Sequence, residues 1–577
     1  MKLSFLDWSI IASYFVVVLV VGFWAARRTG KNIRSYFLAG QNMPWWLIGV
    51  SMVATTFSTD TPNLVTDLVR QNGVSGNWGW WAFLLTGMLT VFVYAQLWRR
   101  SDILTDIEFY ELRYSGRAAA FLRGFRALYL GLIFNVLVMG SVSLAAVKFG
   151  EIVLGWPGWC TLLISCSITL AYSTIGGLRA VIITDFIQFF LAMIGSIWAT
   201  IYILDLPQIG GLSNLVLHQN TINKLSIFPD FKDPNIWVPV FMVPLAVQWW
   251  ASYYPGSEPG GGGYIAQRML SAKNEKHAIG ATLLFNISHY ALRPWPWILI
   301  ALSSLIIFPD LSDIQRAFPN LPEDKLGHDV AYPAMLTLLP AGLLGLVAAS
   351  LIAAFMSTMS TQLNLGASYL VNDFYFRFIN SDASEKQLVR VGRLFTVLSI
   401  IFGAGLGLML KSAGQAFTLL LMIGSGTGLI YILRWFWWRI NAYTEIVAMI
   451  SSLIIACIFN FSDFNMENWE KIVLGSILTT IFWVLGTFFT PPDDEKTLKD
   501  FVNKINPGGP GWKNYSSSQK VVSSNLPRGI LSMILGCIAV YGILIGTGQF
   551  LYGYFLVSFS LYLVVVFSSF LLYKIWK

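Results

Sequence analysis

Long apolar segments separated by short polar loops run along the whole chain. A membrane-spanning helix needs about 20 apolar residues, because it crosses ~30 Å of hydrocarbon at ~1.5 Å per residue. By this measure the sequence predicts fifteen transmembrane helices and an all-α polytopic membrane protein. The predicted helices cover residues 6–26, 44–70, 78–98, 120–149, 158–173, 181–205, 236–253, 279–307, 334–370, 391–410, 413–438, 443–459, 470–489, 529–547 and 550–575.

The composition agrees with this pattern. Of the 577 residues, 55% are hydrophobic and only 12% are charged, whereas soluble proteins carry about 25% charged residues. The net charge of +8 would suit a nucleic-acid partner, but the basic residues follow the loops of a membrane protein. No cluster of metal ligands and no catalytic motif stands out. We therefore expect neither an enzyme nor a nucleic-acid-binding protein, and a lipid bilayer as the surroundings of the chain.

The basic residues predict the orientation. Most of the 38 Lys and Arg residues fall in alternate loops, beginning with the loop that holds Arg27, Arg28, Lys31 and Arg34. Because basic loops stay on the cytoplasmic side, the N-terminus is expected outside and the C-terminus in the cytoplasm of a cell-membrane protein. The largest inner loop, 490–528, includes an amphipathic stretch, which we interpret as an interfacial helix on the inner leaflet. Its apolar residues are Leu498, Phe501, Val502 and Ile505.

The second predicted helix is unusually polar at its centre. Residues 51–63 read SMVATTFSTDTPN, and Pro62 cannot donate the helical hydrogen bond to Ser58. Such a stretch favours an unwound segment whose free carbonyls suit a small cation and whose half-helix N-terminus suits an anionic group. The alternative is a kinked helix whose hydroxyls bond back to its own carbonyls.

The ninth predicted helix carries a stripe of hydroxyl groups. At ~100° per residue, Ser357, Thr358, Ser360 and Thr361 fall on one face. Hard oxygen ligands without thiol or imidazole suit Na⁺ better than a transition metal. The alternative is close packing of small residues between helices.

The eighth predicted helix contains His289 and Arg293, with prolines directly after the arginine. Arg293 could bind a carboxylate or phosphate of a solute; equally, it could be a structural partner of Asp60. His289 fits a packing residue better than a proton carrier. The aromatic clusters are typical of an interfacial belt, with stacking on a sugar as the alternative. They comprise Trp80, Trp81, Trp249, Trp250, Tyr253 and Tyr254.

Several motifs together resemble the sodium:solute symporter family, which includes sodium-coupled sugar, proline and sialic acid carriers. The resemblance extends over about residues 5–510. The motifs are SYFLAG at 35–40, IGGLRAV at 175–181 leading into TDFIQ at 184–188, Gln267-Arg268, and the Ala-x-x-Ser-Thr pattern that begins at Ala354.

The resemblance implies a leucine-transporter-like core of two inverted five-helix repeats. It divides the chain into a leading helix and inner loop (1–43), a ten-helix transport core (44–438) and four trailing helices (439–577). It also implies a sodium site formed by the carbonyls of Ala54, Phe57 and Ala354 and the hydroxyls of Ser357 and Thr358. The positions that match a second sodium site of some members are Asp185, Ser357, Ser360 and Thr361, although Asp185 would alternatively serve the inner gate.

Solute positions in the family lie on the unwound part of the second helix, which here gives Thr56, Asp60 and Thr61; Arg293 is a further candidate from the residues themselves. The sequence Thr-Asp-Thr-Pro at 59–62 departs from the acid and glutamine of sugar carriers, so no subgroup's solute can be transferred. Asp60 with Arg293 favours a zwitterion or hydroxylated acid, whereas the aromatic residues favour a sugar.

We therefore predict a secondary active transporter that couples Na⁺ influx to uptake of a small polar organic solute (sugar, amino acid or organic acid) by alternating access, working as a monomer. One alternative is a proton-coupled transporter with Asp60 and His289 as carriers. Another is a non-transporting sensor on the same scaffold.

Overall fold

The computed structural model describes residues 3–27, 32–250, 259–319, 321–410, 426–461, 465–515 and 526–576. Within these ranges the chain is helical, and extended pairing is limited to an isolated bridge between Met43 and Ala272. The described residues contain eleven helical stretches long and apolar enough to cross a membrane, which confirms the polytopic all-α class. These are Phe5–Ala26 (α1), Val74–Ser101, Gly116–Leu154, Gly158–Leu204 (α11), Glu275–Ile307, Leu343–Ile379, Glu385–Met409 (α21), Ala442–Phe459, Asn468–Phe489 (α24), Leu526–Leu551 (α26) and Phe555–Trp576 (α27).

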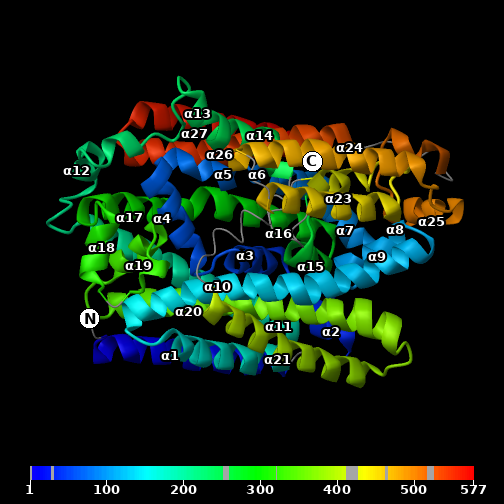
Figure 1. The fold of residues 1–577 in the computed structure, drawn as a ribbon, viewed down its shortest axis with the longest axis horizontal. Helices are drawn as coiled ribbons and strands as arrows, with labels where there is room; N and C mark the ends of the chain where they lie inside the picture. Colours follow the sequence, from blue (N-terminus) through cyan, green and yellow to red (C-terminus); the bar gives the residue numbers. More distant parts are fainter. Residues whose placement is uncertain are drawn as a thin grey trace.

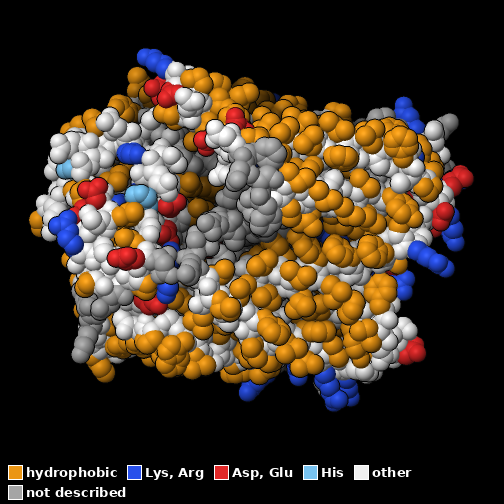
Figure 2. All heavy atoms as spheres, in the orientation of Figure 1, with side chains coloured by type: hydrophobic (Ala, Val, Ile, Leu, Met, Phe, Trp, Pro, Cys, Tyr) orange, Lys and Arg blue, Asp and Glu red, His pale blue; other side chains and the backbone are white. Residues whose placement is uncertain are grey.

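The long helices lie side by side along the long axis of the molecule (Figure 1). The short helices α12 (Leu212–Leu217) and α18 (Leu311–Ala317) lie at one end, and α8 (Phe109–Arg113) and α25 (Glu495–Ile505) lie at the other. Figure 2 shows a broad hydrophobic band with charged side chains gathered at the two ends. The loops that the charge pattern assigns to opposite sides of the membrane therefore lie at opposite ends of the molecule.

One helix forms the centre of the bundle. The apolar part of Leu343–Ile379, which comprises α20 (Leu343–Ser368) and a π-helical end (Tyr369–Ile379), is 94% buried, whereas that of α27 is 11% buried. The hydroxyl stripe on α20 is therefore enclosed by protein.

The second predicted segment is broken, as expected. α3 (Trp45–Thr55) ends within the polar stretch, and α4 (Asp60–Asn72) begins within it. In the four residues between them, Phe57 N–H donates to the carbonyl of Ala54 at 3.1 Å instead of to the residue four earlier. We call residues 56–59 the α3–α4 break.

The fifth and sixth predicted segments meet in α11, which bends sharply at Gly177. This residue has φ 53° and ψ −161°, and a Cβ atom there would lie 2.4 Å from the carbonyl oxygen of Tyr36. Only glycine fits such a turn and such a close approach. Two helices therefore follow one another with scarcely any loop.

Two other predicted segments differ from continuous helices. Residues 236–253 contain two prolines, and a third lies just before them. The described part of this region forms only short pieces: α13 (Pro234–Trp237), a π turn (Val238–Met242), α14 (Val243–Ala246) and a 3₁₀ turn (Gln248–Trp250). The helix α15 (Gly263–Ser271) follows. Of the segment 413–438, residues 413–425 lie outside the described residues, and 426–433 are helical.

The amphipathic stretch in the inner loop is helical, but its predicted place on the leaflet is wrong. All four apolar residues of α25 are at most 1% exposed. The Phe501 ring lies 5.9 Å from Phe109 and 5.4 Å from Trp512, centroid to centroid. The apolar face is covered by the end of the bundle that holds Phe109 and Trp512, because the aromatic residues there pack against it.

Phe501→Ala should therefore lower the free energy of unfolding by about 3 kcal/mol, since truncation of a buried phenylalanine removes apolar contacts and leaves a cavity. Thermal unfolding of the purified protein in detergent measures the loss. Lys499→Ala, on the exposed side of the same helix, is the matched control and should change stability little. Equal effects of the two substitutions would show that α25 does not pack on the bundle.

Candidate functional site

The hydroxyl stripe of α20 faces the α3–α4 break. Thr358 Oγ1 donates to the carbonyl of Thr55 at 3.0 Å and lies 3.4 Å from that of Phe57. Ala54 and Ala354 are each 2% exposed, and Ala354 lies one helical turn before Thr358. Two members of the predicted first sodium site are therefore in direct contact, the Thr358 hydroxyl and the Phe57 carbonyl.

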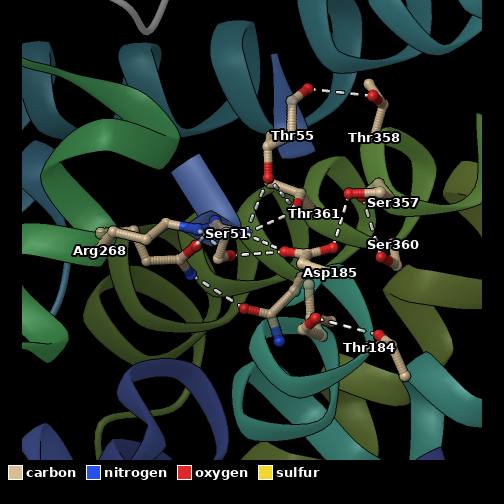
Figure 3. A network of polar contacts seen from close by, with 12 residues as sticks. Ser51, Thr55, Thr184, Asp185, Arg268, Ser357, Thr358, Ser360 and Thr361 are labelled. Atoms are coloured by element: carbon tan, nitrogen blue, oxygen red, sulfur yellow. Dashed lines mark hydrogen bonds and ion pairs between the residues drawn. The ribbon is translucent and has the colours of Figure 1, made fainter. Parts of the chain in front are cut away.

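Ser357 turns to the other side, toward α11. Its hydroxyl donates to Asp185 Oδ1 at 2.6 Å, and Ser51 on α3 donates to Oδ2 of the same carboxylate at 2.5 Å (Figure 3). Asp185 is fully buried. A carboxylate deep in a membrane protein is costly unless it is paired and hydrogen-bonded, and these two hydroxyls supply part of that compensation.

The other two members of the predicted second site have different partners. Ser360 Oγ donates back to the carbonyl of Ser357 at 3.0 Å. Thr361 Oγ1 lies 3.1 Å from Thr55 Oγ1 and accepts a hydrogen bond of 2.6 Å from Arg268. The structure therefore brings Ser357 directly to Asp185, while Thr361 belongs to the same polar cluster through Arg268.

Arg268 is the residue that the sequence reasoning missed as a site member. It lies on α15, is fully buried, and places Nη2 3.6 Å from Asp185 Oδ2. In the sequence, Arg268 stands out only as part of the Gln267-Arg268 family motif. Its burial depends on contacts between segments far apart in sequence.

Arg293 reaches the break from the opposite side. It lies between a π turn (Ser288–Leu292) and α17 (Pro294–Ile307). Its Nη1 donates to the carbonyl of Val53 at 3.0 Å, and its Nη2 donates to the carbonyl of Thr56 at 3.2 Å and to His289 Nδ1 at 2.6 Å. The guanidinium also lies against Trp297, 5.1 Å from the ring centroid. It therefore satisfies carbonyls at the end of α3.

The predicted solute residues Thr56, Asp60 and Thr61 lie in the α3–α4 break and at the start of α4. Thr56 Oγ1 lies 3.2 Å from His289 Nδ1, and Thr61 Oγ1 lies 3.5 Å from Asp60 Oδ1. Asp60 is half-buried, and no cation among the described residues pairs with it within 4.0 Å. The buried hydroxyls of Ser58 and Thr59 also have no hydrogen-bond partner among the described residues.

Aromatic rings lie next to this cluster. Trp80 stacks on Tyr290 at 5.9 Å and meets His289 edge to face at 5.5 Å. Trp80 and Trp81 are 7% and 0% exposed, so their interpretation as an interfacial belt is wrong: both rings lie inside the bundle.

Comparison with known proteins gives a consistent result. A family model for the sodium:solute symporter family matches residues 36–454. A sodium/glucose cotransporter of Vibrio parahaemolyticus is 27% identical over 515 residues, covering 85% of this chain and 92% of that protein. A sodium/mannose cotransporter of Bos taurus is 28% identical over 489 residues, with coverages of 79% and 78%. A sodium/myo-inositol cotransporter of Mus musculus is 25% identical over 557 residues, with coverages of 85% and 74%.

A solved structure supports the fold. It is the substrate-bound, outward-open state of a Na⁺-coupled sialic acid symporter, 21% identical, with a TM-score of 0.68 and coverages of 85% of this chain and 99% of that chain. The family model covers well over half of the sequence. The chain belongs to the sodium:solute symporter family.

Proposed function

We propose that this Na⁺-coupled symporter takes up neutral, hydroxylated solutes such as sugars or polyols by alternating access. The observation that supports the ion site best is the meeting of the Thr358 hydroxyl with the carbonyls of the α3–α4 break. Hydroxyl and carbonyl oxygens are hard ligands that suit Na⁺, and unwound transmembrane segments supply such carbonyls in transporters.

Two ion positions follow from this arrangement. The first would use the carbonyls of Ala54, Phe57 and Ala354 and the hydroxyls of Ser357 and Thr358. The second would use Asp185, Ser357, Ser360 and Thr361, and the 2.6 Å contact between Ser357 and Asp185 supports it. Ser357 would then join the two sites, so that occupation of one changes the ligands available to the other.

The number of ions decides how steeply solute accumulates. One Na⁺ that enters down ~100 mV and a ~10-fold gradient releases roughly 3.7 kcal/mol, enough for ~500-fold accumulation of a neutral solute. A second Na⁺ would square that ratio. Both sites therefore matter for the transport capacity of the protein.

The contacts of Arg293 support a neutral solute. Its two terminal nitrogens are directed at the carbonyls of Val53 and Thr56 and at His289, so its charge serves the end of α3 more than a solute carboxylate. Because His289 Nδ1 accepts from Arg293, the imidazole is also a poor choice for the proton carrier. We therefore assign Arg293 to holding the break.

Asp60, Thr56 and Thr61 would then bind the solute. A carboxylate and hydroxyls at a half-helix N-terminus accept and donate hydrogen bonds to hydroxyl groups, and the Trp80 ring nearby offers an apolar surface for a sugar face. Three relatives are cotransporters of glucose, mannose and myo-inositol, which are all neutral and carry several hydroxyl groups.

We further propose fifteen membrane crossings, with the N-terminus outside and the C-terminus in the cytoplasm. The ten helices of 44–438 would form the two inverted repeats, after the leading helix of 1–43 and before the four helices of 439–577. The protein would act as a monomer in the cell membrane and catalyse no reaction.

Thr358→Val should weaken sodium binding, because it removes a ligand oxygen and keeps the shape of the side chain. We expect the Na⁺ concentration for half-maximal thermal stabilisation, measured against K⁺ at constant ionic strength, to rise at least tenfold, about 1.4 kcal/mol. Ser350→Ala is the control: this buried hydroxyl on the same helix bonds only to the carbonyl of Val347. Equal responses of the wild type to Na⁺ and K⁺ would contradict the sodium site and favour proton coupling.

Asp60→Asn should impair uptake of a polyol with little effect on sodium binding. In proteoliposomes with an inward Na⁺ gradient, we expect the wild type to accumulate glucose, mannose or myo-inositol but no amino or organic acid, and Asp60→Asn to lower that uptake at least tenfold. Asp67→Asn, on the same helix but bonded to Gln71, is the matched control. Accumulation of a carboxylate by the wild type would refute the neutral-solute assignment.

A further inference from the structure

A fixed positive charge lies inside the ligand set of the second sodium site. The side chains of Arg268 and Asp185 are both 0% exposed, with Nη2 and Oδ2 3.6 Å apart. Figure 3 shows the guanidinium directed from α15 into the cluster formed by α3, α11 and α20. Burial of an arginine in a membrane protein costs desolvation energy, which a paired carboxylate offsets only in part. Charged residues in such places commonly serve a function.

The guanidinium contacts two of the groups that a sodium ion in the second site would need, Thr361 and Asp185. Arg268 Nη2 donates to Thr361 Oγ1 at 2.6 Å and to Thr55 Oγ1 at 3.3 Å, and Nε donates to Ser51 Oγ at 3.3 Å. The Thr361 hydroxyl and the Oδ2 edge of Asp185 are therefore engaged by arginine. Only the Ser357 edge of the carboxylate is free of it.

The charge balance leads to the same conclusion. Asp185 and Arg268 together are neutral, and no other acidic or basic residue among those described pairs with either of them. A sodium ion added to this pair would leave one unbalanced positive charge in a region shielded from water, where charges interact strongly. Sodium without arginine, or arginine without sodium, keeps the cluster neutral.

We propose that Arg268 is a built-in substitute for the second sodium ion: it neutralises Asp185 when sodium has left, and it withdraws when sodium enters. This inference rests on the second site of the proposed function. As a consequence, the empty transporter returns from the inward-open to the outward-open state with the charge of Asp185 neutralised by Arg268. Release of sodium on the inner side is also easier, because arginine takes its place.

Arg268 also has a partner outside the proposed ligand set. Nη1 donates to Gln267 Oε1 at 3.0 Å, and Gln267 is itself held by Asn364 at 2.9 Å. The start of α15 is fixed by Asp106, whose Oδ2 accepts from Gly263 N–H at 2.7 Å. In the proposed exchange the guanidinium would leave Asp185 by rotation of its side chain and keep its bond to Gln267, while the helix stays in place.

Arg268→Gln tests the inference, because it removes the competing charge and keeps a polar side chain. Binding of ²²Na⁺ to the purified protein should show two ions per molecule, with the second bound at least about tenfold more tightly than in the wild type. Arg268→Lys keeps the charge and should stay within about threefold of the wild type. The double variant Arg268→Gln with Asp185→Asn should bind one ion.

Weaker or unchanged binding of the second ion in Arg268→Gln would overturn the inference. If that variant does not fold, Thr55→Val gives the same test more gently, since it removes a partner of Arg268 that is not a proposed ligand hydroxyl. We then expect about threefold tighter binding of the second ion, and weaker binding would refute the inference. A wild type that binds no sodium would instead refute the proposed function.

Discussion

The architecture depends on how four non-helical residues are satisfied in the middle of a membrane. In hydrocarbon, every unpaired backbone group costs several kcal/mol, so a broken helix persists only where protein supplies the missing partners. The last turn of α3 and the α3–α4 break receive them from two sides. Thr358 on α20 reaches the carbonyls of Thr55 and Phe57, and Arg293 reaches those of Val53 and Thr56. The two donors differ in charge and adaptability, which gives the two sides of the break different functions.

Arg293 is a permanent hydrogen-bond donor on one side of the break. On the other side, an ion could replace the hydrogen bonds that Thr358 donates. Arg293 carries a permanent charge and several hydrogen-bond donors, it packs against the Trp297 ring, and it holds the end of α3. Thr358 brings one neutral hydroxyl, which in the proposed first site would turn from hydrogen-bond donor to ion ligand. The adjacent Asp185 cluster also combines hydroxyls, those of Ser51 and Ser357, with a charged partner, Arg268. Unlike Arg293, Arg268 would move in our proposal, because it would leave Asp185 when sodium enters the second site.

Sequence reasoning predicted the features that depend on local chemistry. The break follows from Pro62 and its polar neighbours, and the hydroxyl stripe follows from the helical period of Ser357, Thr358, Ser360 and Thr361. The all-α membrane class follows from the long apolar segments.

Features that depend on tertiary partners could not be predicted in this way. The amphipathic pattern of α25 indicates an apolar face but not what covers it, and Phe501 proved to face protein. Tryptophans such as Trp80 and Trp81 suit a membrane interface as well as the inside of a helical bundle, so the residue type alone does not distinguish the two places. Arg268 entered the site only through contacts between residues 51, 185 and 361, which no local pattern reveals. The fifteen crossings stay a prediction: among the described residues eleven continuous helical stretches are long enough to span a membrane, while two predicted segments share α11, two are broken into shorter helices and one lies partly outside the described ranges.

The most direct test is an experimental structure of the protein determined at high resolution in Na⁺ and again in K⁺. The account predicts a Na⁺-specific density between the carbonyl of Phe57 and the hydroxyl of Thr358, with the Thr358 hydroxyl turned toward the ion and not donating to Thr55. Absence of such a density in Na⁺, with the bond from Thr358 to Thr55 retained, would contradict the claim that the α3–α4 break and α20 hold the coupling ion.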